Sequence, residues 1–119
     1  MPSSTGETGE RLAADYLVKQ RGYTIIALNW RCPVGEIDII ARDHDTLVFV
    51  EVKTRHAAST EAAFASITPA KREKLTRAAY TYLNGQAAED ALWRIDVVAV
   101  ALSRHALPII HYVQDAFDW

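Results

Sequence analysis

Charged side chains interrupt two short apolar segments near the middle of the chain. The first segment is residues 35–40, Gly-Glu-Ile-Asp-Ile-Ile, and the second is residues 48–53, Val-Phe-Val-Glu-Val-Lys. Their alternation predicts two β-strands, and the turn residues 43–46 between them predict a hairpin. A strand that carries carboxylates where core residues are expected is a candidate for chemistry rather than for packing.

Counting outward from the turn gives the register of the predicted hairpin. The expected pairs are Asp43–Thr46, Ile40–Phe49, Asp38–Glu51 and Glu36–Lys53. Side chains alternate along a strand, so the last three pairs share one face. Asp38 and Glu51 then stand opposite each other, where like charges are destabilising. A hard divalent cation would relieve this repulsion, because Mg²⁺ is bound by one or two carboxylates with waters and substrate phosphate.

The same segments contain further groups suited to phosphoryl chemistry. Two carboxylates holding a cation can polarise a phosphoryl oxygen and lower the pKa of a bound water. Lys53 points the same way as Glu51 and could orient that water or stabilise charge on the phosphate. Val52 faces away, and its carbonyl is a candidate oxygen ligand. Glu10 lies within about 20° of the apolar residue Leu17 on a helical wheel, so it is aimed at the sheet.

The basic residues of a predicted second helix have two interpretations each. Lys71 starts on the apolar side of a predicted helix, as a snorkelling lysine or as a phosphate contact. Lys74 and Arg77 on the same helix form either a solvated face or a nucleic-acid surface. Arg55 is a candidate phosphate contact. Asp96 could join the site or pair with a nearby basic side chain, and a structural role is favoured.

The elements that must position these residues follow from caps and periodicity. A helix over about 7–20 is indicated by Ser4 and Glu7, which resemble a capping box, and by Gly22 as its stop. Thr68 and Pro69 begin a second helix that ends near Asn84. The remaining expected segments are strands at 23–29, 93–102 and 109–113, a loop at 56–66, and a loop closed by Pro108. The order is α-β-β-β-α-β-β.

The predicted hairpin is apolar on both faces. The expected first face has Ile37, Ile39, Val48, Val50 and Val52, and the second has Ile40, Leu47 and Phe49. A sheet of this kind must be covered on both sides. We therefore expect an α/β fold, with a central mixed five-stranded sheet flanked by helices.

Composition bounds the class of protein. The 119 residues predict a single domain over 1–119, with about 1–6 frayed. A formal net charge of −2 argues against a strongly basic, non-specific DNA coat but not against a local basic patch. The single cysteine excludes an internal disulfide framework and fits a cytoplasmic protein. The apolar runs are too short to span a bilayer, so no membrane partner is expected.

The spacing of Asp38 and Glu51-Val52-Lys53 resembles the Asp…Glu-x-Lys signature of the PD-(D/E)xK nuclease superfamily, which has the restriction-endonuclease-like fold. The chain as a whole is similar to the YraN-like family of small bacterial endonuclease-like proteins. The features that match are Gly9-Glu10, Gly22-Tyr23, Asn29, residues 35–40, residues 47–55, Lys71, Leu75, Tyr82-Leu83 and residues 94–98. Gly-Glu-Ile-Asp replaces the usual proline-aspartate and leaves Asp38 in place.

This resemblance implies a function for individual residues. It implies Glu10, Asp38 and Glu51 as ligands of Mg²⁺ or Mn²⁺, and Lys53 as the catalytic lysine. Members resemble archaeal Holliday-junction resolvases, which implies DNA as the partner, branched or junction DNA included, and by analogy a homodimer. Two alternatives stay open: a non-catalytic nucleic-acid-binding module, and an interaction protein that docks through its tail, residues 116–119.

Overall fold

The computed structural model describes residues 4–88 and 90–116 of the chain. The helices are α1 (Thr5–Arg21), α2 (Glu61–Ala65) and α3 (Pro69–Gly85). The strands are β1 (Thr24–Cys32), β2 (Gly35–Asp43), β3 (Thr46–His56), β4 (Leu92–Ser103) and β5 (Ala106–Val113). The predicted order and the predicted five-stranded sheet are confirmed, with one short helix added. No helix in the described ranges is long and apolar enough to cross a membrane.

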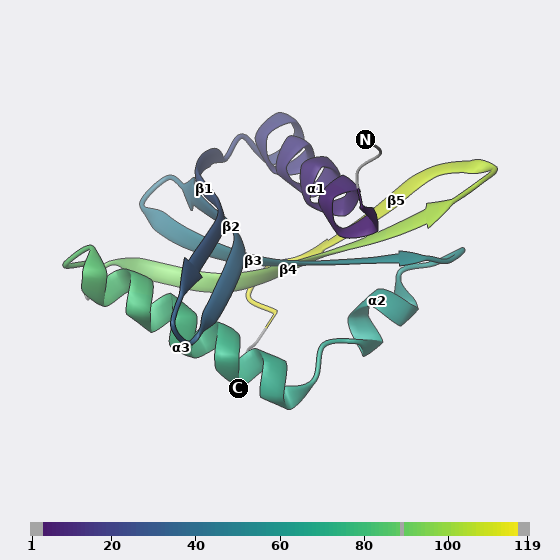
Figure 1. The fold of residues 1–119 in the computed structure, drawn as a ribbon. Helices are drawn as coiled ribbons and strands as arrows, with labels where there is room; N and C mark the ends of the chain where they lie inside the picture. The colour runs from purple at the N-terminus through teal and green to yellow at the C-terminus, as the bar shows by residue number, and fades with distance from the viewer. Residues whose placement is uncertain (1–3, 89, 117–119) are drawn as a thin grey trace.

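The sheet is mixed, and its strands lie in sequence order from β1 to β5. Neighbours are antiparallel except for β3 and β4, which run parallel. A parallel pair needs a crossover connection. Here α2 and α3 form that crossover and lie on one side of the sheet, while α1 lies on the other (Figure 1).

Two apolar clusters hold these layers together. Beneath α3, the buried side chains of Leu75 and Leu83 pack on Ile40 and Phe49 of the sheet. Beneath α1, Ala13 and Leu17 pack on Ile39 and on alternate valines of β3, Val48, Val50 and Val52. The two-sided burial predicted for the hairpin is therefore confirmed. Ile37 is the exception, because it packs in the α3 cluster and not beside Ile39.

Both long helices begin where their caps predict. The Ser4 hydroxyl accepts from the backbone N–H of Glu7 at 3.1 Å, and the Thr68 hydroxyl accepts from that of Lys71 at 3.2 Å. Each bond satisfies an N–H group that has no partner within its helix. Gly22 ends α1 with φ of 73°, a left-handed conformation that glycine adopts without strain.

The structure corrects three boundaries. Helix α1 begins at Thr5, two residues before the expected start, with Ser4 as its cap. The loop expected at 56–66 contains α2, whose Phe64 packs against the α3 cluster. Pro108 lies inside β5 rather than in a loop before it. A proline without an N–H is tolerated there because β5 is an edge strand.

The hairpin register is correct near the turn and wrong beyond it. Asp43 pairs with Thr46 and Ile40 with Phe49, as expected. The ladder then ends at Ile39 and Val50, so the predicted Asp38–Glu51 and Glu36–Lys53 pairs do not form. Past that point β3 continues beside β4 as far as His56 and Leu102, whereas β2 follows β1 and turns across the other strands (Figure 1).

Candidate functional site

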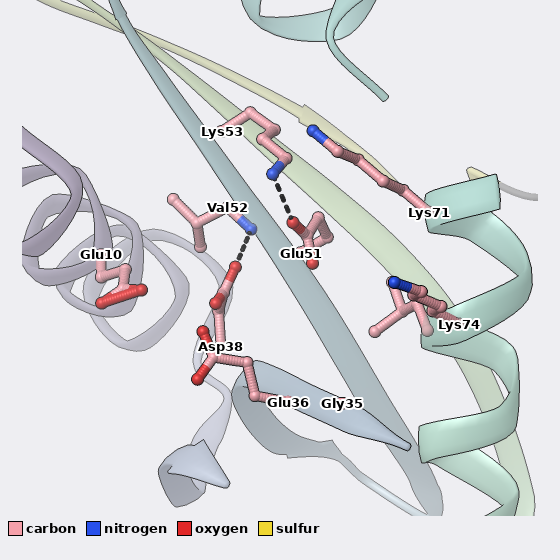
Figure 2. A pocket seen from close by; sticks show the side chains of 10 residues that line it. Glu10, Gly35, Glu36, Asp38, Glu51, Val52, Lys53, Lys71 and Lys74 are labelled. Carbon is pink, nitrogen blue, oxygen red and sulfur yellow. Dashed lines mark hydrogen bonds and ion pairs between the residues drawn. The ribbon is translucent and has the colours of Figure 1, made fainter. Parts of the chain in front are cut away.

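The candidate residues gather where β2 separates from β3. A pocket of about 360 Å³ opens there. Its lining comes from both helical layers, since Glu10 belongs to α1 and Lys71 to α3. The whole lining is Glu10, Gly35, Glu36, Asp38, Glu51, Val52, Lys53, Lys71, Lys74 and Leu75. Because β2 and β3 separate here, side chains from the α1 side and from the α3 side of the sheet line the same pocket (Figure 2).

Asp38 is the most buried carboxyl group of this pocket, with 8% of its surface exposed. Its Oδ2 accepts a hydrogen bond from the backbone N–H of Val52 at 2.8 Å, which joins β2 to β3 after their ladder has ended (Figure 2). Burial, followed by the charge of Glu51, raises the pKa of Asp38 to about 8. The group is therefore mostly protonated at neutral pH unless a cation is present.

Glu51 and Lys53 share a face of β3 and form an ion pair. Lys53 Nζ lies 3.0 Å from Glu51 Oε1, and both side chains are largely buried (Figure 2). The predicted link between Glu36 and Lys53 is wrong, because Glu36 leaves the ladder and pairs with Arg31 of β1 at 3.3 Å. Glu36 still lines the pocket, from a more exposed position.

Glu10 reaches the pocket from α1, as the helical wheel predicted. Figure 2 shows its carboxylate directed toward Asp38 and β3. Burial raises the pKa of Glu10 above its ordinary value, and the charges of Glu36 and Glu51 add to the effect, while hydrogen bonding to Asp38 and Asn29 opposes it. Glu10 and Asp38 are thus two neighbouring carboxyl groups that both resist ionisation.

The basic candidates divide into two groups. Lys71 and Lys74 of α3 line the pocket opposite Glu10, and Lys71 Nζ donates to the carbonyl of Ser66 at 3.2 Å. Arg77 faces a different surface hollow, beside Tyr80 on the outer side of α3. Arg55 is exposed, and its Nη1 donates to the carbonyl of Thr54. The structure brings the two lysines to the carboxylates and leaves the two arginines outside the pocket.

Asp96 lies outside the pocket, in a separate hydrogen-bonded network. It is fully buried, and both of its oxygens accept from Arg94 Nε, at 3.1 and 3.2 Å. It also accepts from the hydroxyl of Tyr112 and from the backbone N–H of Asp115. These contacts tie β4 to β5 and to the segment after it, so the expected pairing of Asp96 with a basic side chain is confirmed.

The donor set of the pocket suits a hard divalent cation. All of its acidic side chains are carboxylates, and two of them have pKa values raised by burial and by negative neighbours. Oxygen ligands of this kind are those that Mg²⁺ and Mn²⁺ prefer. In the described residues no three His, Cys, Asp or Glu side chains converge on one point. The carboxylates share the pocket without forming a closed ligand cage.

The sequence named Asn29 and Gly9 only as family matches and assigned neither a place in this site. Asn29 lies beside Glu10 and Asp38 in an adjoining pocket, with a left-handed backbone. Asparagine within a strand is a weak signal for such a conformation. Gly9 packs directly on Thr54, next to Lys53, and a Cβ atom at Gly9 would lie 1.7 Å from Thr54 Oγ1. A lone glycine inside a helical pattern is the signal for this close approach.

Comparison with known proteins gives one consistent result. The model of the uncharacterised protein family UPF0102 matches residues 9–100. A UPF0102 protein of Geotalea uraniireducens (strain Rf4) is 48% identical over 115 residues, which cover 97% of this chain and 90% of the relative. One of Chloroflexus aurantiacus (strain ATCC 29366 / DSM 635 / J-10-fl) is 51% identical over 96 residues, 80% of this chain and 77% of the relative.

Proposed function

We propose, from the chemistry of its own pocket, that this chain, which belongs to the uncharacterised protein family UPF0102, is a Mg²⁺- or Mn²⁺-dependent nuclease that hydrolyses phosphodiester bonds of DNA. The observation that carries the proposal is the meeting of Glu10, Asp38 and Glu51 with Lys53 in one pocket. The Asp…Glu-x-Lys spacing of the PD-(D/E)xK superfamily and its resemblance to junction resolvases agree with this and suggest branched DNA as a substrate.

Each group has a role that its position supports. Glu10, Asp38 and Glu51 would hold the cation, with the carbonyl of Val52 as a further oxygen ligand. When bound, the cation supplies Lewis-acid polarisation of a phosphoryl oxygen. Lys53, held 3.0 Å from Glu51, places a positive charge where negative charge develops on the phosphate during attack by water.

The lysines of α3 extend the site along a strand of nucleic acid. Lys71 and Lys74 are exposed on the wall opposite Glu10, so their ammonium groups can meet phosphates next to the one that is cleaved. Such contacts fix the position of the backbone without reading sequence. The protein would therefore select a substrate by shape rather than by base identity.

The experiment is incubation of purified protein with linear, flapped and four-way DNA, with Mn²⁺, with Mg²⁺ and with EDTA. We expect cleavage that needs the metal. Asp38→Ala and Glu51→Ala should abolish it, and Lys53→Ala should reduce it about a hundred-fold or more, as removal of pre-organised charge does. Glu36→Gln is the matched control, because Glu36 lines the same pocket but pairs with Arg31. Cleavage that survives in Asp38→Ala would place the activity elsewhere.

One observation favours a second candidate, a nucleic-acid-binding module without catalysis. Lys53 already neutralises Glu51, so the pocket as it stands can receive phosphate through Lys71 and Lys74 alone. This candidate predicts salt-sensitive DNA binding that is the same in EDTA and in Mn²⁺, with no product on any substrate. Absence of binding to any DNA at low salt would favour a protein-interaction role, and residues 117–119 of the tail considered for it lie outside the described residues.

A further inference from the structure

Asn29 has a backbone conformation that is unusual for a strand residue. Its φ angle is 51°, in the left-handed region, although it lies inside β1. Few residues other than glycine adopt this region, and asparagine is enriched among those that do. A residue held in such a conformation within a regular element points to a functional constraint.

The pairing of β1 with β2 is interrupted at this position without a change of register. Leu28 pairs with Ile39 and Trp30 with Ile37, while no pair is recorded between Asn29 and Asp38, the residues between them. Ile37 and Ile40 pack in the same cluster beneath α3, although they are three positions apart. Strict alternation would place them on opposite faces. The alternation of β2 therefore breaks beside Asp38, which lies opposite the left-handed Asn29.

The side chain of Asn29 also meets the site. Asn29, Glu10 and Asp38 line a second pocket of about 340 Å³, which adjoins the first through Glu10 and Asp38. Hydrogen bonding to the Asn29 side chain lowers the pKa of Glu10 and so favours its ionised form. A carboxylate can only accept, so the amide of Asn29 is the donor. Asn29 thus lies beside Glu10 through its side chain and opposite Asp38 through its backbone.

We propose that Asn29 is a positioning residue of the site: its left-handed backbone turns Asp38 into the gap between β2 and β3, and its amide holds the carboxylate of Glu10. The inference rests on the proposed function for its consequence in cleavage, and on the pocket that Asn29 shares with Glu10 and Asp38 for the contact. Outer partners that orient ligands in this way commonly change metal affinity by 10–100-fold when they are removed.

Asn29→Gly tests the amide without straining the backbone, because glycine adopts positive φ freely. His44→Gly is the matched control, since His44 has φ of 53° in the exposed turn between β2 and β3. We expect Asn29→Gly to need about tenfold more Mn²⁺ for half-maximal cleavage and for half-maximal thermal stabilisation by Mn²⁺ alone. His44→Gly should match the wild type in both. Equal Mn²⁺ requirements in wild type and Asn29→Gly would overturn the inference and leave the nuclease proposal standing.

A second measurement separates the contact from the activity. Urea unfolding of wild type, Asn29→Gly, Glu10→Ala and the double variant, all in EDTA, gives the coupling between the two side chains. We expect the single effects to differ from additivity by at least about twofold in the unfolding equilibrium constant. Strict additivity would overturn the contact. If the cycle shows a clear coupling while the wild-type protein neither responds to Mn²⁺ nor cleaves DNA, the contact is supported and the proposed function is overturned.

Discussion

Gly9 sets the distance between the helix that carries Glu10 and the strand that carries Glu51 and Lys53. A Cβ atom at Gly9 would lie 1.7 Å from Oγ1 and 2.8 Å from Cβ of Thr54. Rotation of the threonine side chain can move Oγ1 but not Cβ. Ordinary contact begins at 3.4 Å, so Gly9→Ala must move α1 away from β3 by about 0.6 Å or more.

This displacement should affect the site more than the fold. Overpacking of a buried contact costs roughly 1–3 kcal/mol, and the gain from glycine to alanine inside a helix returns about 1 kcal/mol. The net loss in free energy of unfolding should therefore be about 0–2 kcal/mol. A misplacement of about 1 Å can lower a reaction rate about a hundred-fold. Glu10 adjoins Gly9, so we expect the metal-dependent cleavage rate to fall by that order.

The assay compares cleavage rate, Mn²⁺ requirement and urea unfolding for wild type, Gly9→Ala and Gly6→Ala. Gly6 lies in the same helix, and a Cβ there would meet only Ser4 Oγ at 3.9 Å, so Gly6→Ala should behave as the wild type. Thr54→Gly added to Gly9→Ala removes the Thr54 Cβ atom together with Oγ1 and should restore part of the activity. Cleavage by folded Gly9→Ala at the wild-type rate and Mn²⁺ requirement would refute the argument that α1 must approach β3 this closely.

Three further predictions follow from the pocket. The pKa of Asp38 is raised to about 8 in the folded protein, from a value near 4 in the unfolded chain. Between these two pH values the folded protein holds a proton that the unfolded chain has released. The free energy of unfolding should therefore fall as the pH rises from about 4 to about 8. Urea unfolding in EDTA at pH 5 and pH 8 should show this loss, at most about 1.4 kcal/mol per pH unit, in wild type and not in Asp38→Asn; equal slopes would contradict it. Thermal melts in EDTA at neutral pH should place Asp38→Asn above wild type, and Mn²⁺ at a hundred times its dissociation constant should stabilise wild type by about 2.7 kcal/mol and the variant little; equal metal shifts would place the cation away from Asp38. In DNA binding titrations, Lys71→Ala and Lys74→Ala should each reduce by roughly one unit the slope of the logarithm of the binding constant against the logarithm of salt concentration. Arg77 lies outside the pocket, so Arg77→Ala should leave this slope unchanged. A change with Arg77→Ala alone would move the interface to the outer face of α3.

The sequence predicted the elements well because their signals are local. Ser4 and Thr68 cap the helices through contacts three residues away, and Gly22 ends α1 through its own backbone conformation. The turn at 43–46 fixed the register of the nearest pairs for the same reason. Local signals of this kind do not depend on how distant segments pack, so a single sequence was sufficient for them.

The residues of the site were predictable, but their arrangement was not. Extending the register from the turn assumed that β2 and β3 stay paired, and the ladder ends at Ile39 and Val50 instead. Asp38 and Glu51 therefore meet at the edge of a gap rather than across a ladder, and Glu36 pairs with Arg31. The interrupted pairing at Asn29 depends on how β1 packs on β2, and periodicity within one strand does not contain that information.

The charges of the pocket would link the proposed cation to the proposed nucleic acid. Four carboxyl groups, Glu10, Glu36, Asp38 and Glu51, line it together with three ammonium groups, Lys53, Lys71 and Lys74. With Asp38 protonated at neutral pH, the negative charges of the carboxylates and the positive charges of the ammonium groups nearly cancel. Without a cation, the pocket would therefore offer a phosphodiester little net attraction. A divalent cation would give the pocket a positive balance even if it displaced the proton of Asp38. The same carboxylates would thus make binding of the cleaved phosphate depend on the metal, while Lys71 and Lys74 would contact its neighbours. A protein of net charge −2 would then need no extended basic surface to recognise DNA.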